Sequence, residues 1–380
     1  MSRMRLKDIA IEKNERVDNP SQSQYSIFVG LEHYDSGEAS IRRHGSTERL
    51  ESTMKVFHSG DILIARRNVY LKRAATVDFD GLTSGDSIVL HIENEAYRRI
   101  APFVLNTDDF WIYANQHADG SMSKRLSPKL LMEYEFSLPD GNLEQVADIL
   151  WAMERVKIAY RELIARTDDL VKSQFIEMFG DPVENPMNWE TQSLLSLGVC
   201  KNGMNFHSSD SGVEVNCLGV GDFKDYDVIS ATEELPTVSL NEIPSADYLL
   251  KDEDIVFVRS NGNKAMVGRS VMVYPRKNPT TFSGFCIRFR NTTSQVIAPF
   301  LLRVLKTDSM RKMMYGRGAN IQNLNQQTLA SLNIPIPPIG MQKHFVSFVE
   351  QSDKSKFAAK QALDNLNASQ KALMNQIFGE

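Results

Sequence analysis

The stretch Asp61-Ile-Leu-Ile-Ala-Arg66 returns later in the chain as Asp254-Ile-Val-Phe-Val-Arg259. Two further pairs follow in the same order: Ile100-Ala-Pro-Phe103 with Ile297-Ala-Pro-Phe300, and Phe179-Gly180-Asp181 with Phe378-Gly379-Glu380. From 61 to 254, from 100 to 297 and from 179 to 378, the offsets are 193, 197 and 199 residues. One recurring tetrapeptide could arise by chance, but three in the same order need a common origin. The sequence therefore predicts two related halves.

Each half is predicted to begin with a β-rich domain and to end in a long helix. In 1–138 and again in 190–338, short β-branched and aromatic runs alternate with Gly, Asp and Asn, which is typical of strands and turns. In 139–180 and 339–380 the apolar residues change to the 3-4 spacing of a coiled coil. The connector 181–189 contains Pro182 and Pro186, so it cannot continue the first helix. The expected fold class is α+β: two similar β-rich domains, each followed by a long helix, with the two helices pairing as an antiparallel coiled coil.

Each helix is predicted to bury one apolar stripe against the other helix. At 1.5 Å per residue, a seam of roughly 36 residues is about 54 Å long. The alternative is that each helix packs only on its own domain. Polar Thr167 and Gln174 interrupt the stripe of the first helix. Its apolar members are Val146, Ile149, Met153, Val156, Tyr160, Leu163 and Leu170. The stripe of the second helix, which also includes Ser352, Lys356 and Gln370, consists of Phe345, Val349, Ala359, Leu363, Leu366, Leu373 and Ile377.

Composition is that of an ordinary globular protein. The 380 residues suffice for two or three domains, and hydrophobic and charged contents of 42% and 24% lie in the usual range. The net charge of −5 comes from the segment 139–186, which has 5 basic and 10 acidic side chains, so both predicted domains are nearly neutral. No apolar signal core or membrane-spanning run is present, which predicts a cytoplasmic protein. The three cysteines are expected to be buried free thiols.

Motifs for catalysis or cofactor binding fail on inspection. Asn185-Pro186-Met187-Asn188 lacks the second proline and the aromatic residue of a DNA-methyltransferase loop. Neither Gly219-Val-Gly221 nor the stretch from Gly262 to Gly268 has the spacing of a nucleotide-binding loop. The seven histidines show no helical i, i+4 pairing, and His207-Ser-Ser-Asp210 is one polar loop rather than a triad. The sequence predicts no metal site, no cofactor and no catalytic centre.

The connector between the halves resembles a known family. The stretch from Ser173 to Pro186, followed by Asn188-Trp189-Glu190, is similar to the central connector of the specificity subunits of type I restriction-modification systems. In the second half, Ile334-Pro-Ile-Pro-Pro338 with Gln342, and the closing stretch from Asn375 to Glu380, resemble the helix that follows each target recognition domain in that family. The resemblance covers the layout of the whole chain and is weakest in residues 1–138.

What the resemblance implies is a non-enzymatic reader of double-stranded DNA. Two target recognition domains, held apart by the paired helices, would each read one half of a split asymmetric site. The resemblance also implies two methyltransferase subunits docked on the helices, restriction (motor-nuclease) subunits joining that complex, and S-adenosylmethionine bound by the methyltransferase. A membrane is not implied.

Three other functions are weighed against this one. A specificity subunit of a type IIB-like system would differ only in its partner enzyme. A two-headed coiled-coil scaffold that binds only proteins would also fit the nearly neutral domains. A solitary nuclease or methyltransferase is disfavoured by the failed motifs.

Candidate DNA-binding residues are side chains with forked donors or acceptors, which suit base edges, or with positive charge, which suits phosphate. They follow the repeated strand in both halves, and the alternative for each group is a solvated loop. In the first half they are Arg66, Arg67, Asn68, Tyr70, Lys72 and Arg73, with Lys124 and Arg125 as a thinner second group. In the second half they are Arg259, Ser260, Asn261, Asn263 and Lys264, with a basic group of Arg303, Lys306, Arg311, Lys312 and Arg317 predicted to lie along a phosphate ridge.

Overall fold

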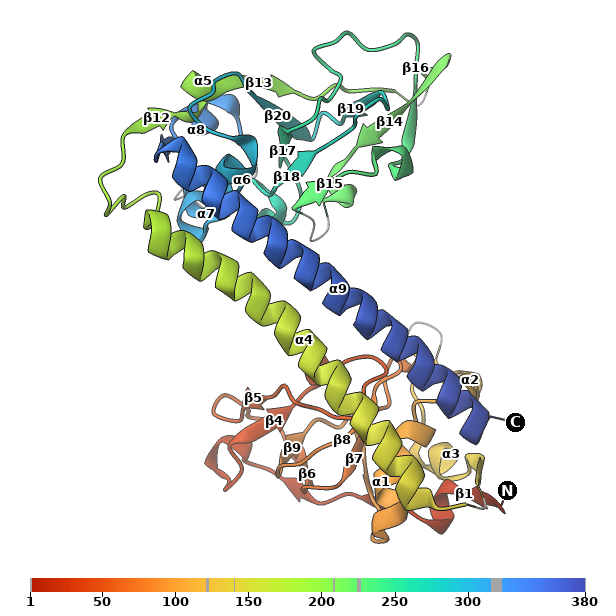
Figure 1. Ribbon diagram of the computed structural model, residues 1–380. Helices are drawn as coiled ribbons and strands as arrows, with labels where there is room; N and C mark the ends of the chain where they lie inside the picture. The colour runs from red at the N-terminus through yellow and green to blue at the C-terminus, as the bar shows by residue number, and fades with distance from the viewer. Residues whose placement is uncertain are drawn as a thin grey trace. The chain divides into compact units, whose positions relative to one another are not determined.

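The computed structural model describes residues 2–120, 123–139, 141–207, 209–223, 227–315 and 323–379. The chain divides into two compact units: residues 1–164 with 358–380, and residues 165–357. Two long helices, α4 (Leu143–Phe179) and α9 (Ile339–Phe378), each contribute one part to each unit (Figure 1). Among the described residues, no helix is both long and apolar enough to cross a membrane.

In the described residues of the first unit, the strands form three sheets, and three short α-helices accompany them. The central sheet has the order β2 (Ile11–Lys13), β10 (Ser87–His91), β7 (Ile62–Ala65), β8 (Ala74–Thr76). The second sheet has the order β3 (Arg16–Val17), β6 (Met54–Phe57), β9 (Gly81–Thr83), β4 (Ile27–Val29), β5 (Gly45–Ser46). The third pairs β1 (Ser2–Arg5) with β11 (Glu135–Leu138). The helices are α1 (Glu95–Val104), α2 (Asp108–Gln116) and α3 (Pro128–Met132).

The second unit repeats this plan. Its central sheet has the order β13 (Gly198–Asn202), β20 (Cys286–Asn291), β17 (Asp254–Val258), β18 (Ser270–Val273), β15 (Val228–Ile229). Its second sheet has the order β16 (Thr237–Leu240), β14 (Val213–Leu218), β19 (Thr280–Phe282), and its third pairs β12 (Thr191–Ser193) with β21 (Asn333–Pro335). The helices are α5 (Leu194–Leu197), α6 (Ala298–Lys306), α7 (Asp308–Tyr315) and α8 (Gln326–Ala330).

The repeated strand occupies the same place in both units. β7 lies between β10 and β8, as β17 lies between β20 and β18, with antiparallel pairing throughout. Every residue of both strands is buried. The sequence of such a strand is a continuous apolar run because both of its faces are covered. In each unit, one face packs against a core that includes the helices, and the other face packs against a separate core cluster. The predicted α+β fold of two similar β-rich domains is confirmed.

The aspartate that opens the repeated strand is buried and paired in both units. Asp61 lies 2.8 Å from Nδ1 of His91 and accepts the backbone N–H of His58. Asp254 accepts two hydrogen bonds of 2.7 Å from Arg290 and one from the backbone N–H of Lys251. A buried carboxylate without such donors would be strongly destabilising, and each unit supplies a different side chain as the partner.

The two long helices each end in a core that contains a repeated Ala-Pro-Phe segment. At the end of α4, the ring of Phe179 lies 4.9 Å from that of Phe300, within the second unit. At the end of α9, Phe378 belongs to the same core cluster as Phe103, within the first unit. The Phe-Gly motif thus packs on the Ala-Pro-Phe motif in the second unit, and in the first unit both motifs belong to one core.

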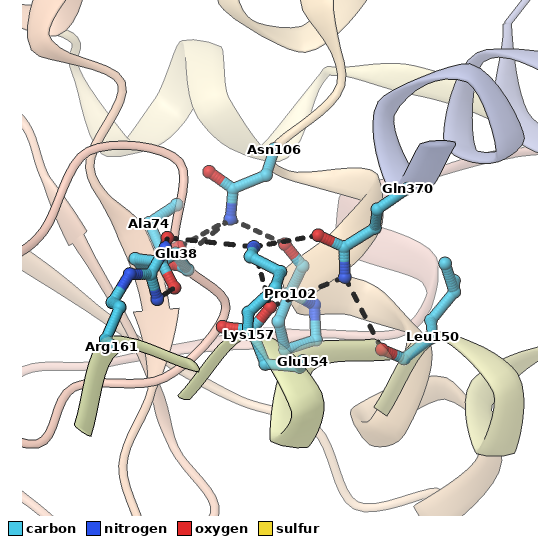
Figure 2. Close-up of polar contacts among 9 residues, drawn as sticks. All are labelled: Glu38, Ala74, Pro102, Asn106, Leu150, Glu154, Lys157, Arg161 and Gln370. Atoms are coloured by element: carbon cyan, nitrogen blue, oxygen red, sulfur yellow. Dashed lines mark hydrogen bonds and ion pairs between the residues drawn. The ribbon is translucent and has the colours of Figure 1, made fainter. Parts of the chain in front are cut away.

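Within the first unit, α4 and α9 are joined by a buried polar network (Figure 2). Nζ of Lys157 donates to Glu154 at 3.0 Å and to Gln370 of α9 at 2.8 Å, and these three side chains are at most 5% exposed. Glu38, from a loop of the β-rich domain, accepts hydrogen bonds from Arg161 and lies 3.6 Å from Lys157. The network thus ties the domain to both helices.

The two carboxyl groups of this network have opposite pKa shifts. Burial raises the pKa of Glu38 and outweighs the opposing hydrogen bond from Arg161, while neighbouring Glu154 raises it further. Burial also acts to raise the pKa of Glu154, but the hydrogen bond with Glu38 and the charge of Lys157 outweigh it, so that this pKa lies below its usual value. Glu38 is therefore the carboxyl of the pair that takes up a proton first.

Within the second unit, the helices are joined by an ion pair and an aromatic cluster. Lys356 of α9 lies 2.6 Å from Asp168 of α4, and the rings of Phe345 and Phe175 lie 5.5 Å apart. Asp168 of α4 contacts Lys356 of α9, and Phe175, further along α4, contacts the earlier residue Phe345. The two helices are therefore antiparallel. The predicted antiparallel pairing is confirmed.

On α9, the predicted stripe faces the core. Phe345, Val349, Ala359 and Leu363 are buried. Leu366, Leu373 and Ile377 are half-buried.

On α4, the predicted stripe was wrong by one position. Val146, Met153 and Tyr160 are half-buried, but Ile149, Val156, Leu163 and Leu170 are between 45% and 51% exposed. The positions that α4 buries are Ala147, Leu150, Glu154, Lys157, Val171, Phe175 and Phe179. The periodicity failed because the buried face uses two charged residues, which a search for apolar residues passes over.

Candidate nucleic-acid interface

In the first unit, the chain leaves the repeated strand β7 in a loop that is fastened to a second loop. The carbonyl of Arg66 accepts the N–H of Leu126 at 2.8 Å, and the N–H of Asn68 donates to the carbonyl of Lys124 at 2.9 Å. Nε of Arg67 donates to Oγ of Ser123 at 2.9 Å. The structure therefore brings together the two groups of candidate residues that the sequence separates by more than fifty positions.

Two arginines of these loops share one carboxylate. Nη1 of Arg67 lies 3.6 Å from Asp86, and Nη2 of Arg125 lies 3.5 Å from the same side chain. Both guanidinium groups remain partly exposed, at 43% and 53%. Asp86 thus orients two forked donors while leaving them accessible, as direct reading of a guanine edge requires.

Beside them the loop presents an aromatic ring in a constrained backbone. Tyr70 is 63% exposed and lies in the short 3₁₀ helix Val69–Leu71. The residues on either side of that helix, Asn68 and Lys72, have φ of 55° and 48°, in the left-handed region. Such conformations are unfavourable for residues other than glycine and tend to occur where function fixes the loop.

The remaining candidates of the first unit are held by the protein itself. Nζ of Lys72 donates to Asp108 at 3.0 Å, and that of Lys124 donates to the carbonyl of Asn115 at 3.2 Å. The guanidinium of Arg73 donates to two backbone carbonyls, and burial lowers its pKa. These three side chains support the loop.

The second unit repeats the same two-loop connection. The carbonyl of Arg259 accepts the N–H of Leu324 at 2.7 Å, and Ser260 forms an isolated β-bridge with Asn323. The first unit has the same bond between Arg66 and Leu126 and the same bridge between Arg67 and Arg125. We call these two surfaces the first and second loop pairs: residues 66–72 with 123–126, and residues 259–264 with 323–324.

The candidate side chains of the second loop pair are partly engaged. Nη1 of Arg259 donates to the carbonyl of Gly284 at 3.3 Å. Asn261 accepts the N–H of Asn263, and Asn263 accepts that of Ala265, so both amide oxygens stabilise the loop. Lys264 is exposed. In both loop pairs a half-buried arginine follows the strand, and at least one amide side chain helps to order the loop beside it.

The predicted phosphate ridge needs correction. Arg303 and Lys306, both on α6, form ion pairs with Asp227. The guanidinium of Arg303 lies 2.5 Å from Asp227 and 3.3 Å from Asp353. Both side chains are half-buried, so they serve ion pairs inside the unit. Arg311 donates to the carbonyl of Ala265 at 3.1 Å. Of the other predicted residues, Lys312 is exposed and Arg317 lies outside the described residues.

Asp227→Asn should therefore destabilise the protein by about 1–3 kcal/mol at pH 7. Burial would raise the pKa of Asp227, but Arg303 and Lys306 outweigh it and hold that pKa below its usual value. Because the folded pKa is depressed, the stabilisation is present above the unfolded pKa, which is about 4 for aspartate, and is lost as pH falls below that value through the folded pKa. Thermal melts at successively lower pH should show wild type converging on the variant. A parallel decline of both, or an equal effect of Glu242→Gln at an exposed position, would contradict this role.

Two residues that lie beside the loop pairs are not among the candidates predicted from the sequence. Asp86 and Phe285 accept the N–H of Arg66 and Arg259 through their backbone carbonyls, at 2.9 and 2.7 Å. They are 199 residues apart, the same offset as the closing motifs of the halves. Asp86 and Phe285 could have been found only by aligning the two halves of the sequence beyond the segments that match.

Within the part of the chain that the structure describes, no group of three or more His, Cys, Asp and Glu side chains is placed to hold a metal ion. The three cysteines are free, and burial raises the pKa of Cys200 and Cys217 to about 12. These thiols therefore stay protonated near neutral pH.

Residues 221–367 match the family model of the type I restriction modification DNA specificity domain. The match lies within the second half of the chain and covers less than half of its 380 residues. It includes the repeated strand β17, the second loop pair and much of α9. The resemblance noted in the sequence is thereby confirmed.

Proteins similar in sequence to this chain are described as specificity subunits as well. The chain is 25% identical over 203 residues to the type I restriction enzyme StySPI specificity subunit of Salmonella potsdam, covering 50% of this chain and 43% of that protein. It is 26% identical over 216 residues to the putative MjaX specificity subunit of Methanocaldococcus jannaschii, covering 51% and 46%. The matched stretch thus spans less than half of either relative.

Solved structures agree in fold along the whole chain. The S subunit of a type I restriction-modification system from M. genitalium superposes with a TM-score of 0.57 at 13% identity, covering 100% of this chain and 96% of that one. A chain from a structure of type I R-M complex assembly and conformational transition superposes with a TM-score of 0.57 at 19% identity, covering 99% and 97%. At this identity the likeness shows a shared fold.

Proposed function

We propose that the chain is a DNA sequence-specificity subunit of a type I restriction-modification system, which reads a bipartite asymmetric site. The observation that carries the proposal is the duplicated loop pair. Both units present an arginine at the end of the same strand, fastened by the same backbone bonds, but surrounded by different side chains. A reader of two different half-sites needs this combination of a shared frame and distinct contacts.

The proposed division of labour follows the repeat. Residues 1–138 and 190–338 are the two target recognition domains, 139–180 and 339–380 are spacer helices, and 181–189 connect the halves. The helices set the spacing between half-sites, as dimer geometry sets it in other DNA readers. The chain itself is non-catalytic and acts in the cytoplasm, and S-adenosylmethionine binds to a partner.

The proposed partners on the helices are two methyltransferase subunits, with restriction subunits joining the complex. The exposed side of α4 supports this part of the proposal. In the first unit, Ile149, Val156 and Leu163 are exposed at steps of seven residues, and in the second unit Leu170 and Ile176 are exposed on the same helix. An apolar stripe at heptad spacing is the surface on which a further helix packs.

Leu163→Glu with Val156→Glu should abolish co-purification with a co-expressed methyltransferase subunit, because two carboxylates would replace apolar contacts in the helix interface. The fold should be unaffected, since both positions are about half exposed. Ile243→Glu, at a 66% exposed position in a loop of the second unit, is the matched control and should leave co-purification intact. Retention of the methyltransferase by the double variant would place the docking surface elsewhere.

The test of DNA reading is selection from a random duplex pool. The full chain, purified with its methyltransferase, should enrich a motif of two defined blocks at a fixed separation. Enrichment of no motif, with binding indifferent to sequence, would contradict the proposed function.

A further inference from the structure

Phe285 is an apolar side chain at the surface of the second loop pair. It is 61% exposed, whereas the next residues along β20, Cys286 and Ile287, are fully buried. A single exposed apolar residue is common on protein surfaces and needs no explanation by itself. The position of Phe285 does need an explanation, because the carbonyl of Phe285 accepts the N–H of Arg259, the arginine of the repeated strand.

The ring is presented on an ordered turn. The N–H of Cys286 donates to the carbonyl of Ser283 at 2.8 Å, and the N–H of Phe285 donates to Oγ of Ser283 at 3.3 Å. The carbonyl of Phe285 accepts the N–H groups of Arg259 and Ser260 at 2.7 and 3.4 Å. The turn is therefore fixed to the start of the second loop pair, and the side chain projects from a backbone that is already positioned.

The first unit has opposite chemistry at the same backbone position. Asp86 accepts the N–H of Arg66 as Phe285 accepts that of Arg259, but its carboxylate lies beside Arg67 and Arg125. One unit thus places a carboxylate that orients arginines, and the other an exposed ring. Within a shared frame, such a difference changes which base the surface can accept.

We propose that Phe285 is a specificity-determining residue of the second half-site and contacts the 5-methyl group of a thymine. This proposal rests on the proposed function. Among the four bases only thymine offers a methyl group in the major groove, and apolar side chains contact it there. Arg259, whose backbone N–H is bound by the carbonyl of Phe285, would supply the donor that reads polar base edges in the same groove.

The experiment compares wild type with Phe285→Ala on the motif that the full chain selects from a random duplex pool. Each thymine of the second half-site is replaced in turn by deoxyuridine, which lacks only the methyl group. At one position, wild type should bind the deoxyuridine duplex roughly fourfold to tenfold more weakly. Phe285→Ala should bind the thymine duplex more weakly by a similar factor and be indifferent to the replacement. Ile243→Ala, exposed in the same unit, should behave as wild type on both duplexes.

Three outcomes would overturn the assignment. In the first, Phe285→Ala selects the same motif with unchanged affinity, so the ring makes no contact. In the second, no thymine replacement by deoxyuridine weakens binding of wild type. In the third, the variant binds more weakly yet keeps the full response, which would mark stacking between bases in place of methyl contact. A wild-type chain that enriches no motif would instead refute the proposed function.

Discussion

Replacing Lys157 by methionine should lower the free energy of unfolding by about 3–5 kcal/mol, the largest effect expected of any single change on α4. Lys157 is 2% exposed and is the cation shared by Glu154, Gln370 and Glu38. Methionine has a similar length but leaves the buried carboxylate of Glu154 without its compensating charge. Urea denaturation followed by circular dichroism measures the loss.

The control is Lys360→Met, the same change at an exposed position of α9 in the same unit. It should alter stability by less than about 0.5 kcal/mol. Glu154→Leu combined with Lys157→Met should recover part of the loss, because removing both charges leaves no unpaired ion. If Lys157→Met and Lys360→Met unfold at the same urea concentration, the network does not hold the first unit together.

The largest effect on function is expected from the two arginines of the repeated strand. Arg66→Ala and Arg259→Ala should each relax recognition at one half-site and leave the other unchanged, with a loss of about 1–3 kcal/mol for the affected block. The reason is that each arginine belongs to a separate loop pair. Selection from a random duplex pool with each variant measures which block of the motif becomes degenerate.

Lys277→Ala is the control for charge alone, since Lys277 is exposed in the second unit outside the loop pair. It should keep both blocks. A uniform loss of affinity across unrelated sequences for Arg259→Ala, with a reduced salt dependence, would mark a phosphate contact. Loss of the same block in both arginine variants would contradict one half-site per unit.

The repeat made most of the fold predictable. The strand that opens with Asp61 or Asp254 is entirely apolar after its first residue, and it occupies the centre of a sheet in both units. The apolar period of α9 likewise matched its buried face. On α4 the same reasoning failed, because Glu154 and Lys157 occupy buried positions that only a partner loop with Glu38 and a partner helix with Gln370 make tolerable.

The candidate site was predictable only in part, for the same kind of reason. Arg303 and Lys306 resemble a basic ridge in sequence, yet their partner Asp227 is 76 and 79 residues away, and nothing local indicates it. Arg67 and Arg125 looked like separate groups until backbone bonds brought their loops together. Phe285 has no feature in sequence that distinguishes it from a core aromatic residue, because its exposure depends on where the turn before β20 lies.

The most direct test is to map methylated bases across the host genome with and without this gene. We expect one split asymmetric motif, with two blocks at a fixed separation, whose methylation disappears when the gene is deleted and returns when it is restored. Methylation that does not change on deletion would contradict the proposed function, and so would loss of methylation at a motif made of one uninterrupted block.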